Sequence, residues 1–159
     1  MSEIYTMPGH LIRRLQQISI SVFTERMKAL GHDLTAPQFA TLAVLSQSPG
    51  IDQATLAGLI AHDRPTIGGV VERLEAKGLV TRRRNEKDRR AMVLDLSEAG
   101  SELLAKLLPE VREMQTDILP GLTEAEHAEF VRLASKVAKL GNESSRAPMI
   151  LPEPDHTKT

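Results

Sequence analysis

The chain has 159 residues, of which 41% are hydrophobic and 3% aromatic, and its formal net charge is -1. This length fits one compact domain or two small lobes that share a core, and an aliphatic interior favours helices over a β-sandwich. The absence of cysteine excludes disulfides and thiolate metal sites. With no apolar run near the roughly 18 residues of a membrane span and no signal-peptide core, we expect a soluble cytoplasmic protein.

The N-terminal part of the chain predicts two helices. The first covers residues 8–30, begins at Pro8 and ends at Gly31. Its apolar face carries Leu11, Leu15, Ile18 and Val22 at 4-3-4 spacing. Thr35 and Gln38 have the spacing of a capping box, which places the start of a second helix there. The buried face of this helix is predicted to hold Phe39, Leu42 and Leu45.

The middle of the chain predicts a pair of helices followed by a hairpin. Asp52 caps a short third helix, Asp63 caps a fourth, and Gly78 ends the fourth. The apolar stripe of the fourth helix is formed by Ile67, Val70, Val71 and Leu74. Two strands are predicted over residues 79–83 and 91–96, joined by a very basic loop.

The C-terminal part predicts two more helices. Ser97 caps a fifth helix that runs to about Ile118 and should bend at Pro109. Thr123 and Glu126 form the capping box of a sixth. The remaining residues shift to Gly, Ser and Pro and indicate a tail, in which Met149, Ile150 and Leu151 are apolar enough to dock on the body.

This order of elements indicates a mainly α fold with a small β-hairpin wing, a winged helix-turn-helix with a helical dimerisation lobe. We expect four segments: an N-terminal helix of the dimerisation lobe (1–34), the winged helix-turn-helix DNA-binding lobe (35–97), C-terminal dimerisation helices (98–140) and a tail (141–159).

The distribution of charge supports a DNA-binding role. From Arg64 to Arg90 the chain has nine basic and four acidic residues, an excess of five positive charges, which leaves -6 for the rest. Such a segment is typical of a polyanion-binding surface, although a solvated charged face would have the same composition. Because a basic hairpin follows a helix pair directly, the pattern favours double-stranded DNA as the partner.

Two runs of residues carry a resemblance to a known family. The first is Pro65-Thr66-Ile67 through Val71-Glu72-Arg73-Leu74-Glu75-Ala76-Lys77-Gly78-Leu79-Val80. The second is Lys87-Asp88-Arg89-Arg90-Ala91, followed by Leu94-Asp95-Leu96-Ser97-Glu98-Ala99-Gly100. They resemble the recognition helix and wing of MarR-type transcriptional regulators, over roughly residues 10–140. The resemblance implies a homodimer that represses or activates transcription and is often released by a small phenolic or aromatic ligand; regulators of aromatic-acid catabolism are the nearest in character.

The wing motif also has a physical interpretation. Arg90 is placed to enter the minor groove, and Asp88 either holds that arginine or braces the wing backbone. Phosphate contacts are expected from Arg82, Arg83, Arg84, Lys87 and Arg89, with plain solubility as the alternative for the first three.

The recognition helix departs from the family at Gly68 and Gly69, where relatives often carry polar or basic residues. Two glycines cost helix stability, about 1 kcal/mol each against alanine. Either the backbone approaches DNA closely there, or the helix packs tightly against another helix. The remaining candidates for DNA contact on this helix are Arg64, Pro65, Thr66 and Arg73, with Arg73 on phosphate.

Two apolar stripes predict association of two copies. The fifth helix carries Leu104, Leu107, Val111, Met114 and Ile118, and the sixth carries Phe130, Leu133, Val137 and Leu140. Both follow a/d-like spacing. A small winged lobe cannot cover these stripes and the first helix as well, so we expect a homodimer, with packing inside one chain as the alternative.

A small aromatic or heteroaromatic acid is the expected effector, with a site near the junction of the two lobes. The candidate ligand-binding residues are Tyr5, His10, Arg13, Arg14 and Phe39. An arginine fork with a His or Tyr donor suits a carboxylate. The alternative is that the arginines are solvated or pair with acids across the dimer and that His10 is a surface residue.

No enzyme motif is present: there is no G-x-S-x-G, phosphate loop or H-E-x-x-H, and the five histidines form no i, i+3 or i, i+4 pair. We therefore expect no catalysis, no metal and no cofactor. The predicted function is that of a sequence-specific regulator, a repressor, bound to a palindromic operator. The alternative is a ligand-independent winged-helix module that binds DNA or a protein.

Overall fold

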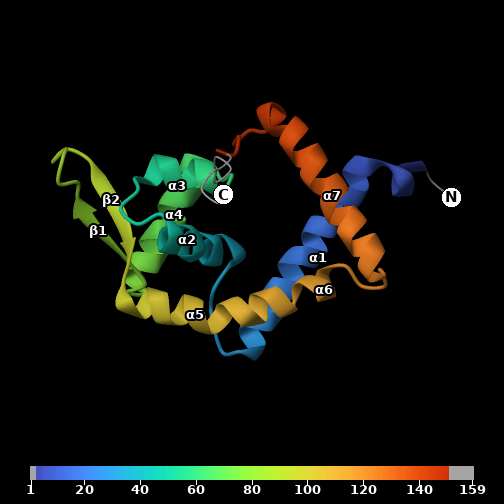
Figure 1. Ribbon diagram of the computed structural model, residues 1–159, viewed down its shortest axis with the longest axis horizontal. Helices are drawn as coiled ribbons and strands as arrows, with labels where there is room; N and C mark the ends of the chain where they lie inside the picture. Colours follow the sequence, from blue (N-terminus) through green and yellow to red (C-terminus); the bar gives the residue numbers. More distant parts are fainter. Residues whose placement is uncertain (1–2, 151–159) are drawn as a thin grey trace, which may run out of the picture.

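The computed structural model describes residues 3–150 as a mostly helical chain with one two-stranded hairpin (Figure 1), which confirms the predicted fold class. The elements are η1 (Glu3–Thr6), α1 (Pro8–Ala29), α2 (Ala36–Gln47), α3 (Gln53–Leu59), α4 (Arg64–Ala76), β1 (Val80–Arg84), β2 (Met92–Leu96), α5 (Glu98–Glu113), α6 (Gln115–Ile118), α7 (Glu124–Leu140) and η2 (Asn142–Ser144).

The helices begin at the predicted caps. The side chains of Thr35, Asp52, Asp63, Ser97 and Thr123 each accept a hydrogen bond from the backbone N–H three residues ahead. The capping boxes of α2 and α7 are complete, because the side chains of Gln38 and Glu126 accept a hydrogen bond from the backbone N–H of the capping residue. Each cap satisfies donors that a helix start would otherwise leave unpaired.

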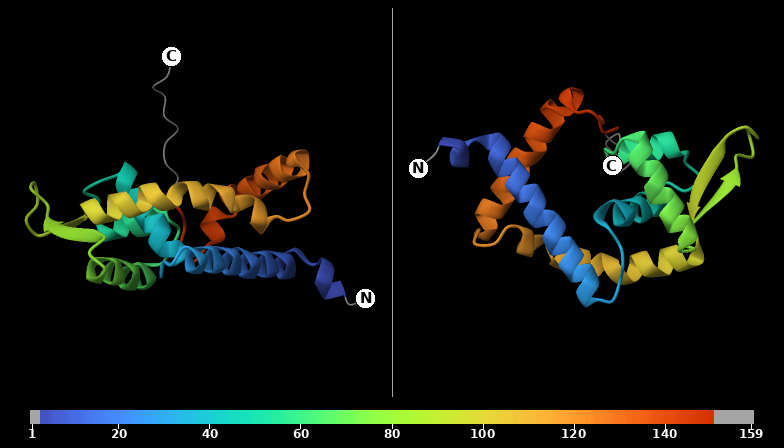
Figure 2. Two further views of the ribbon diagram at one scale, coloured as in Figure 1. Left: turned by 90° about the horizontal axis from the view of Figure 1, so that it is seen from below. Right: turned by 180° about the vertical axis from the view of Figure 1, so that it is seen from behind.

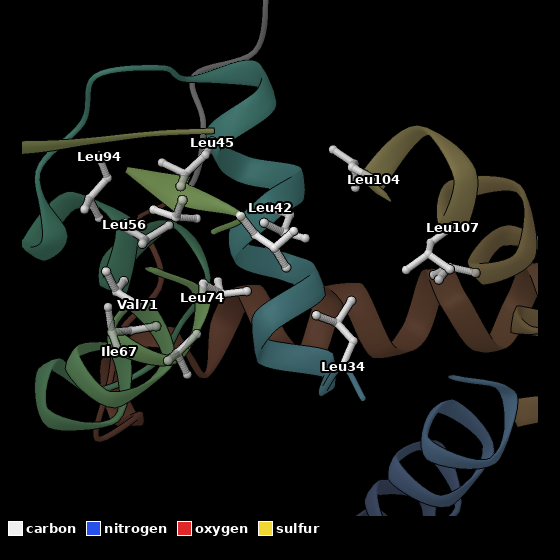
Figure 3. Close-up of a cluster of buried hydrophobic side chains, with 14 of the residues drawn as sticks. Leu34, Leu42, Leu45, Leu56, Ile67, Val71, Leu74, Leu94, Leu104 and Leu107 are labelled. Atoms are coloured by element: carbon white, nitrogen blue, oxygen red, sulfur yellow. The ribbon is translucent and has the colours of Figure 1, made fainter. Parts of the chain in front are cut away.

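The hydrophobic core lies between α2, α3, α4, the hairpin and α5 (Figure 3). The side chains of Leu42, Leu56, Ile67, Val71 and Leu74 are completely buried in it. The predicted stripe of α4 faces this core in full, since Val70 is buried as well. The opposite face of α4 is therefore the one that the fold presents to solvent.

The predicted fifth helix is in fact two helices, α5 and α6, separated at Met114. Side chains replace backbone donors at this point. The Gln115 amide donates to the Val111 carbonyl at 2.8 Å, and the Thr116 hydroxyl donates to the Glu113 carbonyl at 3.0 Å. Such bonds compete with the helical ladder. Pro109, in contrast, lies within α5.

The stripe on α5 does not form the expected dimer seam. Leu104, Leu107, Val111 and Met114 are buried in the core of their own chain, which corrects the prediction in favour of intrachain packing. The stripe on α7 is different, because Leu133, Val137 and Leu140 are 46%, 64% and 76% exposed. No residue of α7 is buried among those that the structure describes.

The chain follows a closed path (Figures 1 and 2). The helix-turn-helix and hairpin lie at one end, α1, α6 and α7 at the other, and α5 joins them. After α7 the chain returns to α3, where the Ile150 N–H donates to the Gly58 carbonyl at 2.8 Å. The predicted docking of the tail is thus found for Ile150, while Leu151 lies outside the described residues. No helix between residues 3 and 150 is long and apolar enough to span a membrane.

Candidate nucleic-acid interface

Helices α3 and α4 form the predicted helix-turn-helix, joined by residues 60–63. The turn is tight: the His62 N–H donates to the Ala57 carbonyl at 3.0 Å, and Ala61 has a positive φ of 54°. Asp63 then caps α4 by accepting from the Thr66 N–H at 2.9 Å. Hydrogen bonds from the Thr66 side chain and backbone hold the pKa of Asp63 below its ordinary value, and the nearby positive charge of Arg146 contributes less.

The N-terminal turn of α4 is open to solvent. Arg64, Pro65 and Thr66 are exposed there, while the adjacent Ile67 is completely buried. In DNA-binding helix-turn-helix proteins this end of the second helix contacts base edges. The structure therefore presents three of the predicted DNA-contacting residues together.

Gly68 and Gly69 follow on the same helix, and the structure bears on the two explanations for them. A Cβ built on Gly69 meets nothing within 4 Å, and one built on Gly68 meets only the Gln53 amide nitrogen, at 3.4 Å. Packing within the described chain therefore does not require glycine at either position. Close approach of a second molecule to the helix backbone remains as a reason.

The wing is an antiparallel pair in which Val80 lies opposite Leu96 and Arg84 opposite Met92. Its base is joined to the turn before α3, because the Leu94 N–H donates to the Ile51 carbonyl at 2.8 Å and the Gly50 N–H donates to the Leu94 carbonyl at 2.9 Å. The hairpin is thus hydrogen-bonded to the helix-turn-helix unit.

Asparagine and aspartate side chains shape the wing tip. The Asn85 side chain accepts from the Lys87 N–H at 2.9 Å, and the Asp88 carboxylate accepts from the Arg90 N–H at 3.0 Å. Of the two roles considered for Asp88, the structure shows the bracing of the backbone. The Arg84 guanidinium donates to the Arg89 carbonyl at 3.2 Å, which ties the tip to the end of β1.

The basic side chains of this surface fall into two groups. Arg82 pairs with Glu75 at 2.8 Å, and Arg83 pairs with Asp95 at 2.6 Å. The other group forms no ion pair within residues 3–150: Arg64, Arg73, Arg84, Lys87, Arg89 and Arg90. The second group therefore carries the positive charge that is available to phosphates.

A separate apolar groove with a volume of about 990 Å³ lies between α1, α6 and α7. Ile12, Leu15, Ile118, Phe130, Leu133 and Val137 are among its lining residues. Arg26 joins α1 to α5 and α6, with its guanidinium 3.1 Å from Glu110 of α5 and 3.0 Å from Asp117 of α6. The bond with Asp117 is the main reason that the pKa of Arg26 is raised. The sequence indicated the α1 and α7 parts of this surface but assigned the α5 stripe to it as well.

Comparisons with known proteins agree with this architecture. A sequence model of the MarR family matches residues 34–92. The HTH-type transcriptional repressor NicR of Pseudomonas putida is 33% identical over 129 residues, which cover 81% of this chain and 80% of NicR. This chain belongs to the MarR family. It is accordingly a transcriptional regulator of that family.

Two solved structures resemble this MarR-family chain closely. The PcaV regulator of Streptomyces coelicolor, in complex with its natural ligand, gives a TM-score of 0.76 at 34% identity, covering 87% of this chain and 96% of PcaV. The second structure is that of Bordetella bronchiseptica BpsR, whose DNA binding is regulated by 6-hydroxynicotinic acid. It gives a TM-score of 0.77 at 29% identity, covering 83% of this chain and 93% of BpsR.

The predicted ligand residues of this MarR-family protein are not all together in one chain. Tyr5 and His10 pack edge to face, with ring centroids 5.6 Å apart, and Arg13 and Arg14 are exposed on the following turn of α1. Phe39 instead packs against Phe23, at 6.0 Å. Phe23 is thirteen residues beyond His10 on α1, which corresponds to about 20 Å along the helix.

Proposed function

We propose that the protein is a repressor that binds a palindromic operator as a homodimer and is released by a small aromatic carboxylate. The unpaired cations at the start of α4 and at the wing tip carry the DNA-binding part of this proposal. Cations without an internal partner displace the counterions condensed on DNA when they reach phosphates, and this release supplies a large share of the affinity for DNA.

The roles follow from position. Arg64, Pro65 and Thr66 read base edges from the start of α4, and Arg73 contacts phosphate. Arg90 enters the minor groove from the wing tip, and Arg84, Lys87 and Arg89 contact phosphates beside it. Asp88 positions Arg90 through the backbone bond. Residues 35–97 form the DNA-binding lobe, while 1–34 and 98–140 form the dimerisation lobe.

A second copy of the chain is the proposed occupant of the apolar groove. Leu133 and Val137 of the exposed α7 stripe line the groove together with Ile12 of α1, which is 60% exposed. Leu11 and Ile20 of α1 are exposed as well, at 45% and 54%. Surfaces of this kind mark association sites.

The effector is proposed to bind through its carboxylate at His10, Arg13 and Arg14, with Tyr5 beside them. BpsR, which responds to 6-hydroxynicotinic acid, and PcaV, solved with its natural ligand, support an effector of this type. Phe39 of α2 packs against Phe23, which is distant from His10 along α1, so participation of Phe39 requires a second chain to bring the two groups together.

Duplexes selected from a random library provide the test. Binding of the selected duplex, followed by fluorescence anisotropy, should weaken with salt at a log–log slope of about 0.9 per phosphate neutralised, so a slope of several is expected. A salt-independent affinity, or failure to select any duplex, would remove DNA binding as the function.

The effector is tested by titrating 6-hydroxynicotinic, benzoic and hydroxybenzoic acids into the protein–DNA complex and into the free protein by calorimetry. An acid that releases DNA from the wild type should act more weakly on the Arg13→Ala and Arg14→Ala variants. Equal responses in all three proteins would refute the arginine anchor. If no acid binds, the ligand-independent module is the better description.

A further inference from the structure

The segment after α7 folds back onto the helix-turn-helix and touches it at two points. We call residues 142–150 the C-terminal strap. Asn142 organises the strap, because its side chain accepts from the Met149 N–H at 2.8 Å and donates to the Met149 carbonyl at 2.9 Å. These two bonds join residues that are seven positions apart in the sequence, and they set the direction in which the chain leaves α7.

The first contact is between Ile150 and Gly58 of α3. The Ile150 N–H donates to the Gly58 carbonyl at 2.8 Å, and the Ile150 side chain occupies the space that a Cβ on Gly58 would need. The three atoms nearest to that Cβ position all belong to Ile150. Glycine in a helix costs stability, so its presence here matches the close approach of the strap.

The second contact is between Arg146 and Asp63. The guanidinium lies 3.0 Å from the carboxylate that caps α4, and 83 positions separate the two residues in the sequence. Arg146 thus offsets the charge of the capping carboxylate, which lies at the N-terminal end of α4, the end that is proposed to face DNA.

We propose that the C-terminal strap positions the recognition helix, with Arg146 and Ile150 as positioning residues that join α7 to the α3–α4 turn. This inference rests on the proposed DNA-binding role of α4. The strap connects the two lobes at a place distant from α5 (Figures 1 and 2). α7 carries the proposed dimer surface, and α4 carries the proposed reading surface. These two helices are therefore connected twice, once through α6 and α5 and once through the strap. A change in the position of α7 is then transmitted to α4 through the strap as well as through α5.

The contact at Gly58 provides the sharper test. Gly58→Ala places a methyl group against Ile150 and should displace the strap while favouring α3 itself. Ile150→Ala in the same chain should reverse the effect, because the Ile150 Cβ lies 3.5 Å from the added carbon, an ordinary contact distance. We expect Gly58→Ala to reduce operator affinity three- to tenfold and the double variant to recover most of it.

Amide hydrogen exchange of the same proteins reports docking directly. In Gly58→Ala, exchange should rise together at residues 58–63 and in the strap, and it should fall again in the double variant. Unprotected strap amides in the wild type, or a displaced strap with unchanged operator affinity, would overturn the proposal. The exchange measurement does not need DNA, so a failure of DNA binding is distinguishable from a failure of the strap.

The ion pair provides a second, independent test. Asparagine caps helices as well as aspartate does, so Asp63→Asn removes the charge and leaves the cap. Arg146→Gln should weaken operator binding three- to tenfold in the wild type and less than twofold in Asp63→Asn, and Arg146→Lys should restore most of the loss. An equal loss in both backgrounds, with a salt slope lower by about one, would show that Arg146 contacts phosphate directly and would refute the positioning role.

Discussion

Replacing Gly69 by alanine separates the stability of the recognition helix from its binding to DNA. The position is inside α4, and an added Cβ meets nothing within 4 Å. The protein should therefore gain the usual difference between alanine and glycine in a helix, about 1 kcal/mol. For a chain of this size that gain corresponds to a rise in Tm of roughly 2–4 °C.

Operator binding should change in the opposite direction. If DNA approaches the backbone of α4 at Gly69, the methyl group separates the helix from the groove floor, and contacts from Arg64 and Thr66 are stretched at the same time. We expect at least a tenfold loss of affinity, which is about 1.4 kcal/mol. The variant would then be more stable and a poorer binder than the wild type.

Thermal unfolding and anisotropy titration on one preparation measure both quantities. Gly9→Ala is a matched control, because a Cβ there also meets nothing within 4 Å and the residue lies on α1, away from the interface. It should leave operator affinity unchanged. Wild-type affinity in Gly69→Ala would refute the close backbone approach, and an unchanged or lower Tm would show that the site is not open in the folded protein.

Three further changes test other parts of the structure. Arg90→Ala should weaken operator binding by about 1–3 kcal/mol with Tm unchanged, whereas Arg132→Ala on α7 should not affect binding; equal affinities would show that the wing tip does not reach DNA. Ala61→Gly should raise the free energy of unfolding by roughly 1 kcal/mol, because glycine adopts positive φ without the cost that alanine carries; chemical denaturation checks this, and a loss of stability would contradict it. Val137→Glu places a charge in the apolar groove and should shift the protein toward monomer in sedimentation, and an unchanged mass would move the dimer surface elsewhere.

Local signals in the sequence predicted the fold well, because each depends on few neighbouring residues. Thr35, Asp52 and Asp63 define helix starts through bonds that span three positions. The stripe of α4 likewise depends only on helical spacing. These features hold whatever the distant parts of the chain do.

Features that depend on distant partners could not be predicted in the same way. The stripe of α5 would be apolar whether it packs in the core of its own chain or against a second chain. Its spacing in the sequence therefore could not distinguish these two kinds of packing. Arg82, one of the predicted phosphate-contacting residues, pairs with Glu75, and this pairing depends on the orientation of the hairpin relative to α4. The contact of Arg146 with Asp63 left no sequence signal, because the pair is not related by any helical or strand spacing.

The two hydrogen bonds between Leu94 and the turn before α3 have a consequence for the kinetics of operator search. They fix the base of the wing in the free protein, and the Asn85 and Asp88 turns restrict its tip. Most of the backbone entropy of the wing is therefore lost when the chain folds, not when it meets DNA. If the wing tip contacts DNA as proposed, association then immobilises mainly its arginine side chains, at about 0.5–1.5 kcal/mol each. A wing already set at its binding angle needs no slow rearrangement after encounter, and association should proceed in one step at a rate governed by electrostatic attraction.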